Sequence, residues 1–117
     1  MKLIVAIIRP DKLDDVQKAL AEKDVYLMTV SEVRGCGRQK GYTEVYRGQE
    51  LKIKLLPKLK LEIAVSQPFV EATVEAITAA ARTGDTGNVG DGKIFVLPLE
   101  DCVRIRTGER GIEAIGP

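Results

Sequence analysis

Residues 59–81, LKLEIAVSQPFVEATVEAITAAA, contain the pattern that decides the fold. Leu59 to Ile63 strictly alternates apolar and polar residues, which predicts a strand with one buried face and one polar face. Ser66-Gln67-Pro68 is a helix-start signal, because proline is tolerated in the first helical turn and a polar residue precedes it. The residues that follow predict a helix whose apolar stripe consists of Val70, Val74, Ile77 and Ala81.

The first third of the chain has the same order of elements. Leu3 to Ile8 is a continuous apolar run rich in β-branched residues, which predicts a central strand covered on both faces. Pro10 opens a predicted helix, and its apolar stripe consists of Leu13, Val16 and Leu20. Tyr26 to Val33 is predicted to be a second strand, since one of its two alternating rows is largely apolar.

The C-terminal third completes the pattern. Ile94 to Leu99 predicts a strand, Val103 to Arg106 predicts a short alternating strand, and the tail from Thr107 is expected to be mobile. The order β-α-β-loop-β-α-β is that of the ferredoxin-like split βαβ arrangement. We therefore expect an α+β, ferredoxin-like domain with both helices on one sheet face. The other face is expected to be solvated, to bind a ligand or to pack in an oligomer, because it would hold Lys60, Glu62, Arg104 and Arg106.

Composition excludes several classes of function. The 117 residues suit one domain, and 18 Lys and Arg against 17 Asp and Glu give a net charge of +1. Such a balance argues against wholesale electrostatic binding to DNA or to acidic membranes. The absence of histidine excludes Ser-His and Cys-His nucleophile pairs and His-ligated zinc. Because Cys36 and Cys102 lack CxxC spacing and no apolar run approaches the ~18 residues of a membrane span, we expect a cytoplasmic protein.

Residues 35–57 are predicted to form one long loop, with glycines at its start and within it and Pro57 at its end. A loop longer than ~15 residues inside a compact domain is uncommon, and it is usually functional or disordered. This segment contains five basic and two acidic residues, so that its charge is +3 and that of the remaining chain is −2. The long loop is therefore a candidate interaction segment.

A second glycine-rich loop spans Thr83 to Lys93, and Gly87 to Lys93 matches GxxxxGK. It is not a complete nucleotide-binding P-loop, because Ile94 offers no hydroxyl for Mg²⁺ and the segment leads into a strand. Glycine backbone beside a lysine can still form an anion-binding nest, although a flexible turn explains the same residues.

Arg104 and Arg106 would share one strand face and could clamp a phosphate, and a solvated edge strand explains them equally. Together with Lys93 and the glycine loops, they indicate a small, anionic and phosphorylated ligand.

Two other classes of protein share this topology. An RNA-recognition domain stacks bases on aromatic residues of its central strands, but this chain has three Tyr and two Phe, and Phe95 stands alone in its predicted strand. We therefore expect no nucleic-acid partner. A small phosphatase of the acylphosphatase type needs an arginine in a phosphate loop near the first strand, and no matching loop surrounds Arg9. We therefore expect that the protein is not an enzyme, although slow ATP hydrolysis is compatible with this expectation.

Several long motifs, in the right order, resemble the PII signal-transduction proteins of the nitrogen-regulatory GlnB/GlnK type. They are residues 28–33, 35–41, 46–48, 56–58, 90–96 and 104–109, so that the resemblance covers essentially the whole chain. It implies a homotrimer of ferredoxin-like subunits, in which residues 1–117 form a single domain. It further implies a T-loop at about 36–57, a B-loop at about 82–93 and a C-terminal loop at about 107–117.

The resemblance also implies ATP or ADP in the cleft between neighbouring subunits. The residues carried over by motif as nucleotide-binding are Thr29, Gly35, Cys36, Gly37, Arg38, Glu62, Ala64, Val89, Gly90, Asp91, Gly92, Lys93, Arg104 and Arg106. Gln39 would help to hold Mg²⁺ on the ATP, and 2-oxoglutarate would chelate that metal. The residues implied for 2-oxoglutarate are Gln39, Lys40, Gly41 and Lys58.

The chain departs from the family pattern at several positions. Leu51 and Gln49 replace the tyrosine and serine that are modified in other members, so we expect no covalent modification. Cys36 stands where the family often has an aromatic residue. The B-loop is about three residues longer than the common TGxxGDGK form, through Asp85 to Asn88.

The function that the resemblance implies is regulation of nitrogen-metabolism targets through the T-loop. Such a target would be an ammonium transporter or a nitrogen-metabolism enzyme, with membrane contact only through a channel partner. Two alternatives stay open at this point. One is a divergent PII-like sensor of another nucleotide or of bicarbonate, and the other is a nitrogenase regulator.

Overall fold

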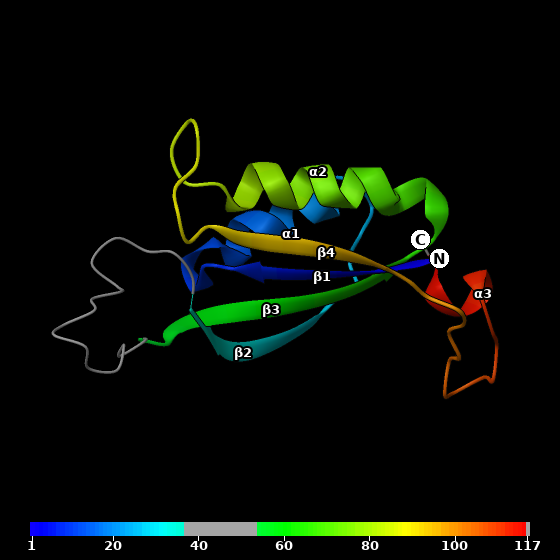
Figure 1. Cartoon of the computed structure of the whole chain (residues 1–117). Helices are drawn as coiled ribbons and strands as arrows, with labels where there is room; N and C mark the ends of the chain where they lie inside the picture. Colours follow the sequence, from blue (N-terminus) through cyan, green and yellow to red (C-terminus); the bar gives the residue numbers. More distant parts are fainter. Residues whose placement is uncertain (37–53, 117) are drawn as a thin grey trace, which may run out of the picture.

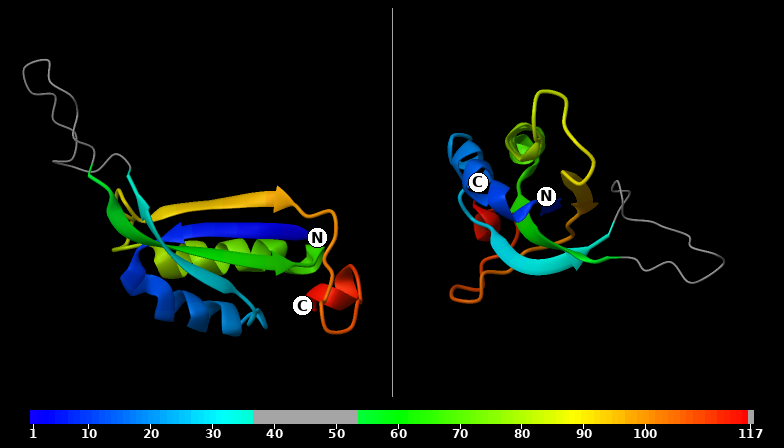
Figure 2. Two further views of the ribbon diagram at one scale, coloured as in Figure 1. Left: turned by 90° about the horizontal axis from the view of Figure 1, so that it is seen from below. Right: turned by 90° about the vertical axis from the view of Figure 1, so that its left-hand side faces the viewer.

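The computed structural model describes residues 1–36 and 54–116. It contains, in chain order, β1 (Lys2–Ile8), η1 (Pro10–Lys12), α1 (Leu13–Ala21), β2 (Thr29–Gly35), β3 (Leu56–Val65), η2 (Gln67–Phe69), α2 (Val70–Ala81), β4 (Gly92–Pro98) and α3 (Ile112–Ile115). The strands form one antiparallel sheet in the order β2-β3-β1-β4. Helices α1 and α2 lie side by side on one face of this sheet (Figures 1 and 2). The predicted α+β ferredoxin-like fold is confirmed.

The hydrophobic core lies between the sheet and these two helices. Ile4, Ala6 and Ile8 of β1 are buried on the helix side, and the alternating residues of β3 from Leu59 to Val65 are buried with them. The expectation that β1 is covered on both faces is wrong for a single chain. Its other residues, beginning with Leu3, keep partial exposure on the open face, because both long helices pack on the opposite side.

Both long helices begin as the sequence predicted. Each starts with a 3-10 turn that holds a proline in its first positions, Pro10 before α1 and Pro68 before α2. Proline suits these positions because a first-turn N–H has no intrahelical partner. In the described part of the chain, no helix is long and apolar enough to cross a membrane.

Strand β2 begins later than predicted, at Thr29 instead of Tyr26. Asp24, three residues after the end of α1, adopts a positive φ of 61°, and the buried Val25 donates its N–H to the carbonyl of Leu20. The chain therefore leaves the helix in a fixed turn before it can join the sheet. Tyr26 and Leu27 remain in the exposed connection.

The C-terminal segment differs most from the prediction. Val103 to Arg106 is not a strand of the sheet, because Val103 forms a single bridge with Arg110 and a turn follows it. Local hydrogen bonds prevail over strand pairing, since the Gly108 N–H donates to the Arg104 carbonyl and the Arg104 N–H donates to the Glu109 carbonyl. The tail expected to be mobile instead folds into α3, in which Ile115 is buried. Arg104 and Arg106 therefore do not share the open sheet face with Lys60 and Glu62.

Candidate functional site

The glycine-rich loop between α2 and β4 lies where three other parts of the chain meet. Gly92 pairs with Ile8 at the end of β1, and Leu56 pairs with Gly35 where β3 begins and β2 ends. Side chains from the end of β1 and the start of β3 contact the loop directly. The end of β2 and the start of β3 therefore lie at the same end of the sheet as this loop (Figure 1).

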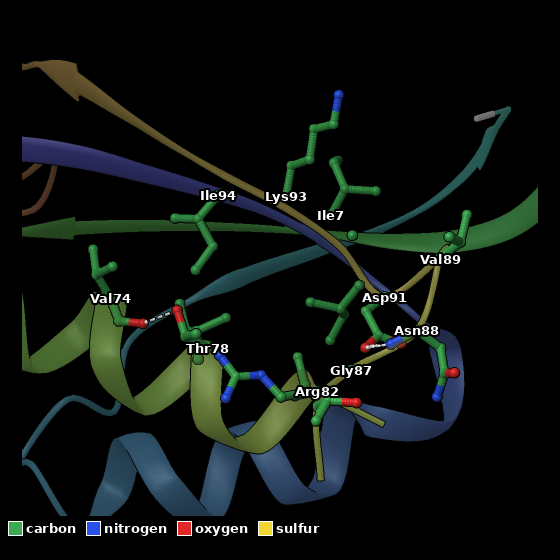
Figure 3. A pocket seen from close by; sticks show the side chains of 15 residues that line it. Ile7, Val74, Thr78, Arg82, Gly87, Asn88, Val89, Asp91, Lys93 and Ile94 are labelled. Atoms are coloured by element: carbon green, nitrogen blue, oxygen red, sulfur yellow. Dashed lines mark hydrogen bonds between the residues drawn. The ribbon is translucent and has the colours of Figure 1, made fainter. Parts of the chain in front are cut away.

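Asp91 organises the loop by accepting four hydrogen bonds. The Thr83 N–H and the Asn88 N–H each donate to Oδ2 at 2.9 Å. The Thr83 hydroxyl donates to Oδ1 at 2.7 Å, and Arg9 Nε donates to the same oxygen at 2.9 Å. The Asn88 side-chain amide then donates to the Thr83 hydroxyl at 2.8 Å. These bonds close the loop at its base, and Figure 3 shows the one between Asn88 and Asp91.

The same contacts keep Asp91 ionised. Partial burial by itself would raise the pKa of this carboxyl. The hydrogen bonds donated by Thr83, Asn88 and Arg9 outweigh burial and hold the pKa of Asp91 well below its usual range. The carboxylate therefore remains charged at every ordinary pH, with the Arg9 guanidinium as its counter-ion.

Two cations hold the backbone of the loop through its carbonyl oxygens. Arg9 Nη2 donates to the Val89 carbonyl at 2.8 Å, and Lys58 Nζ donates to the Gly90 carbonyl at 2.6 Å. Burial and the neighbouring Arg9 lower the pKa of Lys58, and Asp91 partly opposes them. Because a trans peptide directs its N–H opposite to its C=O, the Gly90 N–H points away from Arg9. An N–H oriented in this way, beside the ammonium of Lys58, is a group that suits a phosphate.

Two glycines shape the end of the loop. Gly90 and Gly92 have φ values of 99° and 114°, in the region that side chains with a Cβ rarely adopt. A Cβ on Gly92 would lie 1.7 Å from the Ile7 carbonyl oxygen. Only glycine therefore lets the loop pass this closely over the end of β1.

A cleft of about 600 Å³ lies between α2, β4 and the loop (Figure 3). Its apolar lining comes from Val74 and Ile77 of α2 and Ile94 of β4, and Arg82 and Asn88 add polar groups. Lys93 also borders it, but its side chain extends to the side of β4 away from α2 (Figure 3). The cleft therefore opens on the helix side of the sheet, whereas the Lys93 side chain lies on the open face.

The structure brings only some of the predicted site residues together. Residues 89–93 are consecutive, and Lys58 joins them because its Nζ donates to the Gly90 carbonyl at 2.6 Å. Gly35 joins them, since a Cβ there would lie 3.7 Å from Lys58 Cγ.

Two other groups of predicted residues lie elsewhere on the chain. Thr29 and Glu62 are cross-strand partners on the open face, with Thr29 at the start of the edge strand β2, and Ala64 is two residues beyond Glu62 along β3. Arg104 and Arg106 follow the far end of β4, because this strand runs from Gly92 beside Ile8 to Pro98 beside Lys2. Cys36 is exposed, and the predicted residues Gly37, Arg38, Gln39, Lys40 and Gly41, like Leu51, lie outside the described residues.

Sequence reasoning missed three residues that build the loop, namely Arg9, Thr83 and Asn88. The sequence contained a signal for Arg9, because Arg9 directly follows a buried strand and Asp91, in the glycine-rich loop, is an acidic residue with which it could pair. The described ranges, 1–36 and 54–116, contain no group of three or more His, Cys, Asp or Glu that could hold a metal ion.

Comparison with known proteins agrees with this architecture. The family model for nitrogen regulatory protein P-II matches residues 1–109. A nitrogen regulatory protein P-II of Rhizobium etli is 54% identical over 115 residues, which cover 98% of this chain and 100% of that protein. One from Microchaete diplosiphon is 56% identical with the same coverage, and nitrogen regulatory protein GlnK1 of Methanosarcina mazei is 54% identical over 98% of this chain and 97% of its own length. The chain therefore belongs to the P-II family of nitrogen regulatory proteins, which are signal transducers and not enzymes.

Proposed function

We propose that this protein senses ATP and ADP, and 2-oxoglutarate together with Mg-ATP, at the subunit interfaces of a homotrimer. It then regulates a nitrogen-metabolism target, such as an ammonium transporter, through a T-loop at about 36–57. The observation that carries the proposal is the separation of the phosphate-binding groups. Loop residues 89–93 lie at one end of the sheet, and Arg104 follows the other end. One chain does not offer both groups to one nucleotide, whereas two neighbouring chains can.

The open face of the sheet supports assembly of several copies. Leu3 and Val5 lie on this face, cross-strand from Leu97 and Phe95. Phe95 is 50% exposed and Leu97 is 42% exposed, so that a contiguous apolar surface is left in the single chain. Such surfaces commonly mark subunit interfaces. Packing of copies through this face also brings the Thr29 and Glu62 pair, which the resemblance assigns to adenine and ribose, into an interface.

Lys58 is the residue through which the proposed signal reaches the T-loop. It stands at the start of β3, and its ammonium donates to the Gly90 carbonyl. A carboxylate or phosphate that attracts this ammonium weakens its bond to the loop. Ligands change the conformation of a loop only by differential affinity for its states, and typical couplings are about 1–3 kcal/mol.

The bound metal would neutralise phosphate charge and link the ATP to 2-oxoglutarate, with Gln39 as its protein contact. Lys40, Gly41 and Lys58 would complete the 2-oxoglutarate site. We further propose a cytoplasmic location and no covalent modification of the T-loop. A binding panel of ATP, ADP, a different nucleotide and bicarbonate tests the choice of ligand, and binding of bicarbonate without ATP would contradict it.

Replacement of Lys58 tests the 2-oxoglutarate site. In Lys58→Ala, the affinity for 2-oxoglutarate in the presence of Mg-ATP should fall at least about tenfold, the scale of a lost hydrogen bond to a charged group. The affinity for ATP alone should fall less, about two- to fivefold, since the Gly90 carbonyl loses one donor. Titration calorimetry measures both.

Lys60→Ala is the matched control, because Lys60 lies on the same face of β3 two residues farther along. It should leave 2-oxoglutarate binding unchanged, and light scattering should show the same oligomer for both variants. An unaltered 2-oxoglutarate affinity in Lys58→Ala would show that this ligand binds elsewhere.

A further inference from the structure

The C-terminal segment already supplies an anion to one of the arginines that the nucleotide site needs. Arg104 Nη1 donates to Glu109 Oε1 at 2.6 Å. Its Nη2 donates to the Glu113 carbonyl at 2.9 Å and to the Ala114 carbonyl at 3.5 Å. The guanidinium of Arg104 is therefore held by a carboxylate and two backbone carbonyls of its own chain.

The carboxylate of Glu109 is held in position by the turn itself. The Thr107 hydroxyl donates to Glu109 Oε1 at 2.8 Å, and the Glu109 N–H donates back to that hydroxyl at 3.2 Å. The backbone of the turn is closed by the Gly108 N–H, which donates to the Arg104 carbonyl at 2.7 Å. The turn thus holds the Glu109 carboxylate in the position from which it accepts the hydrogen bond of Arg104.

This ion pair is open to exchange with an anion from solvent. The Arg104 side chain is 37% exposed and that of Glu109 is 39% exposed. An exposed pair of this kind contributes little net stability, because water competes for both charges. A phosphate group carries more charge and can accept two parallel hydrogen bonds from a guanidinium, whereas Glu109 accepts one from Arg104, so that a phosphate can replace the carboxylate.

Arg106 lies in the same turn in a different state. It is exposed, and its side chain has no acidic partner within the described residues. The two arginines that the motif treats alike are therefore unlike in this structure. The Arg106 guanidinium can bind an anion directly, whereas the Arg104 guanidinium must first break its hydrogen bond to Glu109.

We propose that Glu109 is an internal competitor for the nucleotide phosphates and that it sets the affinity of the site by occupying Arg104. The inference rests on the proposed function, in which Arg104 reaches the phosphates held by a neighbouring subunit. Glu109 is then a residue that tunes affinity without contacting the nucleotide. Its removal should strengthen binding, whereas the removal of a phosphate ligand should weaken it.

The test is Glu109→Gln in the full-length protein, with ATP and Mg²⁺ as the probe in titration calorimetry. The glutamine oxygen still accepts hydrogen bonds from Arg104 and Thr107, so the turn is retained while the competing charge is removed. We expect the affinity to rise about two- to fivefold, the scale of an exposed ion pair. In an Arg104→Ala background, the same substitution should give no gain, because the two residues act as one unit.

Glu113→Gln is the matched control. It removes the same charge from α3, and no described residue donates a hydrogen bond to the Glu113 carboxylate, whereas its backbone carbonyl still accepts from Arg104. Glu113→Gln should leave the affinity for ATP unchanged. That result would show that the gain in Glu109→Gln comes from the release of Arg104 and not from the change in net charge. If thermal unfolding shows that Glu109→Gln is damaged, Glu109→Asp keeps the charge and withdraws it from Arg104, and it should give a smaller gain.

Two results would overturn the inference in distinguishable ways. If the unaltered protein binds ATP and Glu109→Gln binds it equally or more weakly, Glu109 only supports the turn and the proposed function stands. If the unaltered protein binds neither ATP nor ADP, the proposed function falls and the inference falls with it.

Discussion

Gly92→Ala is expected to destabilise the folded chain by about 4 kcal/mol or more, in the range reserved for severe steric or packing damage. The new Cβ would lie 1.7 Å from the Ile7 carbonyl oxygen and 2.8 Å from its carbon, so that backbone must move away from backbone. A positive φ of 114° adds a conformational cost. The start of β4 would separate from the end of β1, and the glycine-rich loop would lose its support. Urea unfolding followed by circular dichroism measures the loss.

Gly108→Ala is the control for this prediction. Gly108 also has a positive φ, 73°, but nothing lies within 4 Å of the position that its Cβ would take. This substitution should cost only about 1–2 kcal/mol, the price of the left-handed backbone alone. Equal losses in the two variants would show that the contact with Ile7 relaxes easily and that the close approach is unimportant.

The second large effect is expected for Asp91→Asn, which should lower stability by about 2–4 kcal/mol. Both carboxylate oxygens accept two hydrogen bonds, so the amide nitrogen of asparagine would face two donors wherever it is placed. The Arg9 guanidinium would also lose its counter-ion. Because the loop would open at its base, the affinity for ATP should fall at least about tenfold.

Urea unfolding and calorimetry with ATP measure these two losses. Asp85→Asn is the matched control, since Asp85 is exposed in the same loop and no hydrogen bond to its side chain is found in the described chain. It should change neither quantity. Normal ATP affinity in Asp91→Asn would show that the phosphates do not depend on the closed loop.

The protonation of Asp91 predicts how stability depends on pH. Hydrogen bonds hold the folded-state pKa of Asp91 below the usual range, so its contribution is fully present above the unfolded-state pKa of about 4. As the pH falls below that value, the unfolded chain binds more protons than the folded chain, and stability decreases. Hydrogen bonds from Arg110 lower the pKa of Asp101 and act in the same direction. The stability difference between the unaltered protein and Asp91→Asn should therefore shrink as the pH falls below about 4. A difference that stays constant would contradict the lowered folded-state pKa of Asp91.

Much of the fold could be predicted because its core elements have unambiguous periodicity. The strict alternation from Leu59 and the helical stripe from Val70 each have one physical interpretation, and the structure confirms both. The alternation from Val103 to Arg106 has two physical interpretations, because apolar and basic residues can alternate over four positions in a turn as well as in a strand. Hydrogen bonds within the turn decided between them, and these depend on Thr107, Gly108 and Glu109 further along the chain.

The candidate site could be predicted only where its residues are neighbours in sequence. Gly90 to Lys93 are consecutive, so the sequence could predict them as one candidate anion-binding loop, and that assignment stays a prediction. Arg9 was not assigned to it, because Arg9 and Asp91 stand 82 positions apart and only the pairing of β1 with β4 brings them together. The competing role of Glu109 was equally hidden, since motif matching treats Arg104 and Arg106 as a pair.

The closure of the glycine-rich loop by Thr83, Asn88 and Asp91 also bears on how this protein can change. Asp85 and Thr86 project beyond the closed base and are exposed, so additions at this tip need not disturb the residues below it. Deletion of residues 85–87 would leave TGNVGDGK, and Thr83-Gly84-Asp85 followed by Thr86-Gly87-Asn88 looks like one short unit written twice. The tip is therefore a natural place for evolution to lengthen the chain, and an engineer could attach a fluorescent reporter there to convert the protein into an optical sensor.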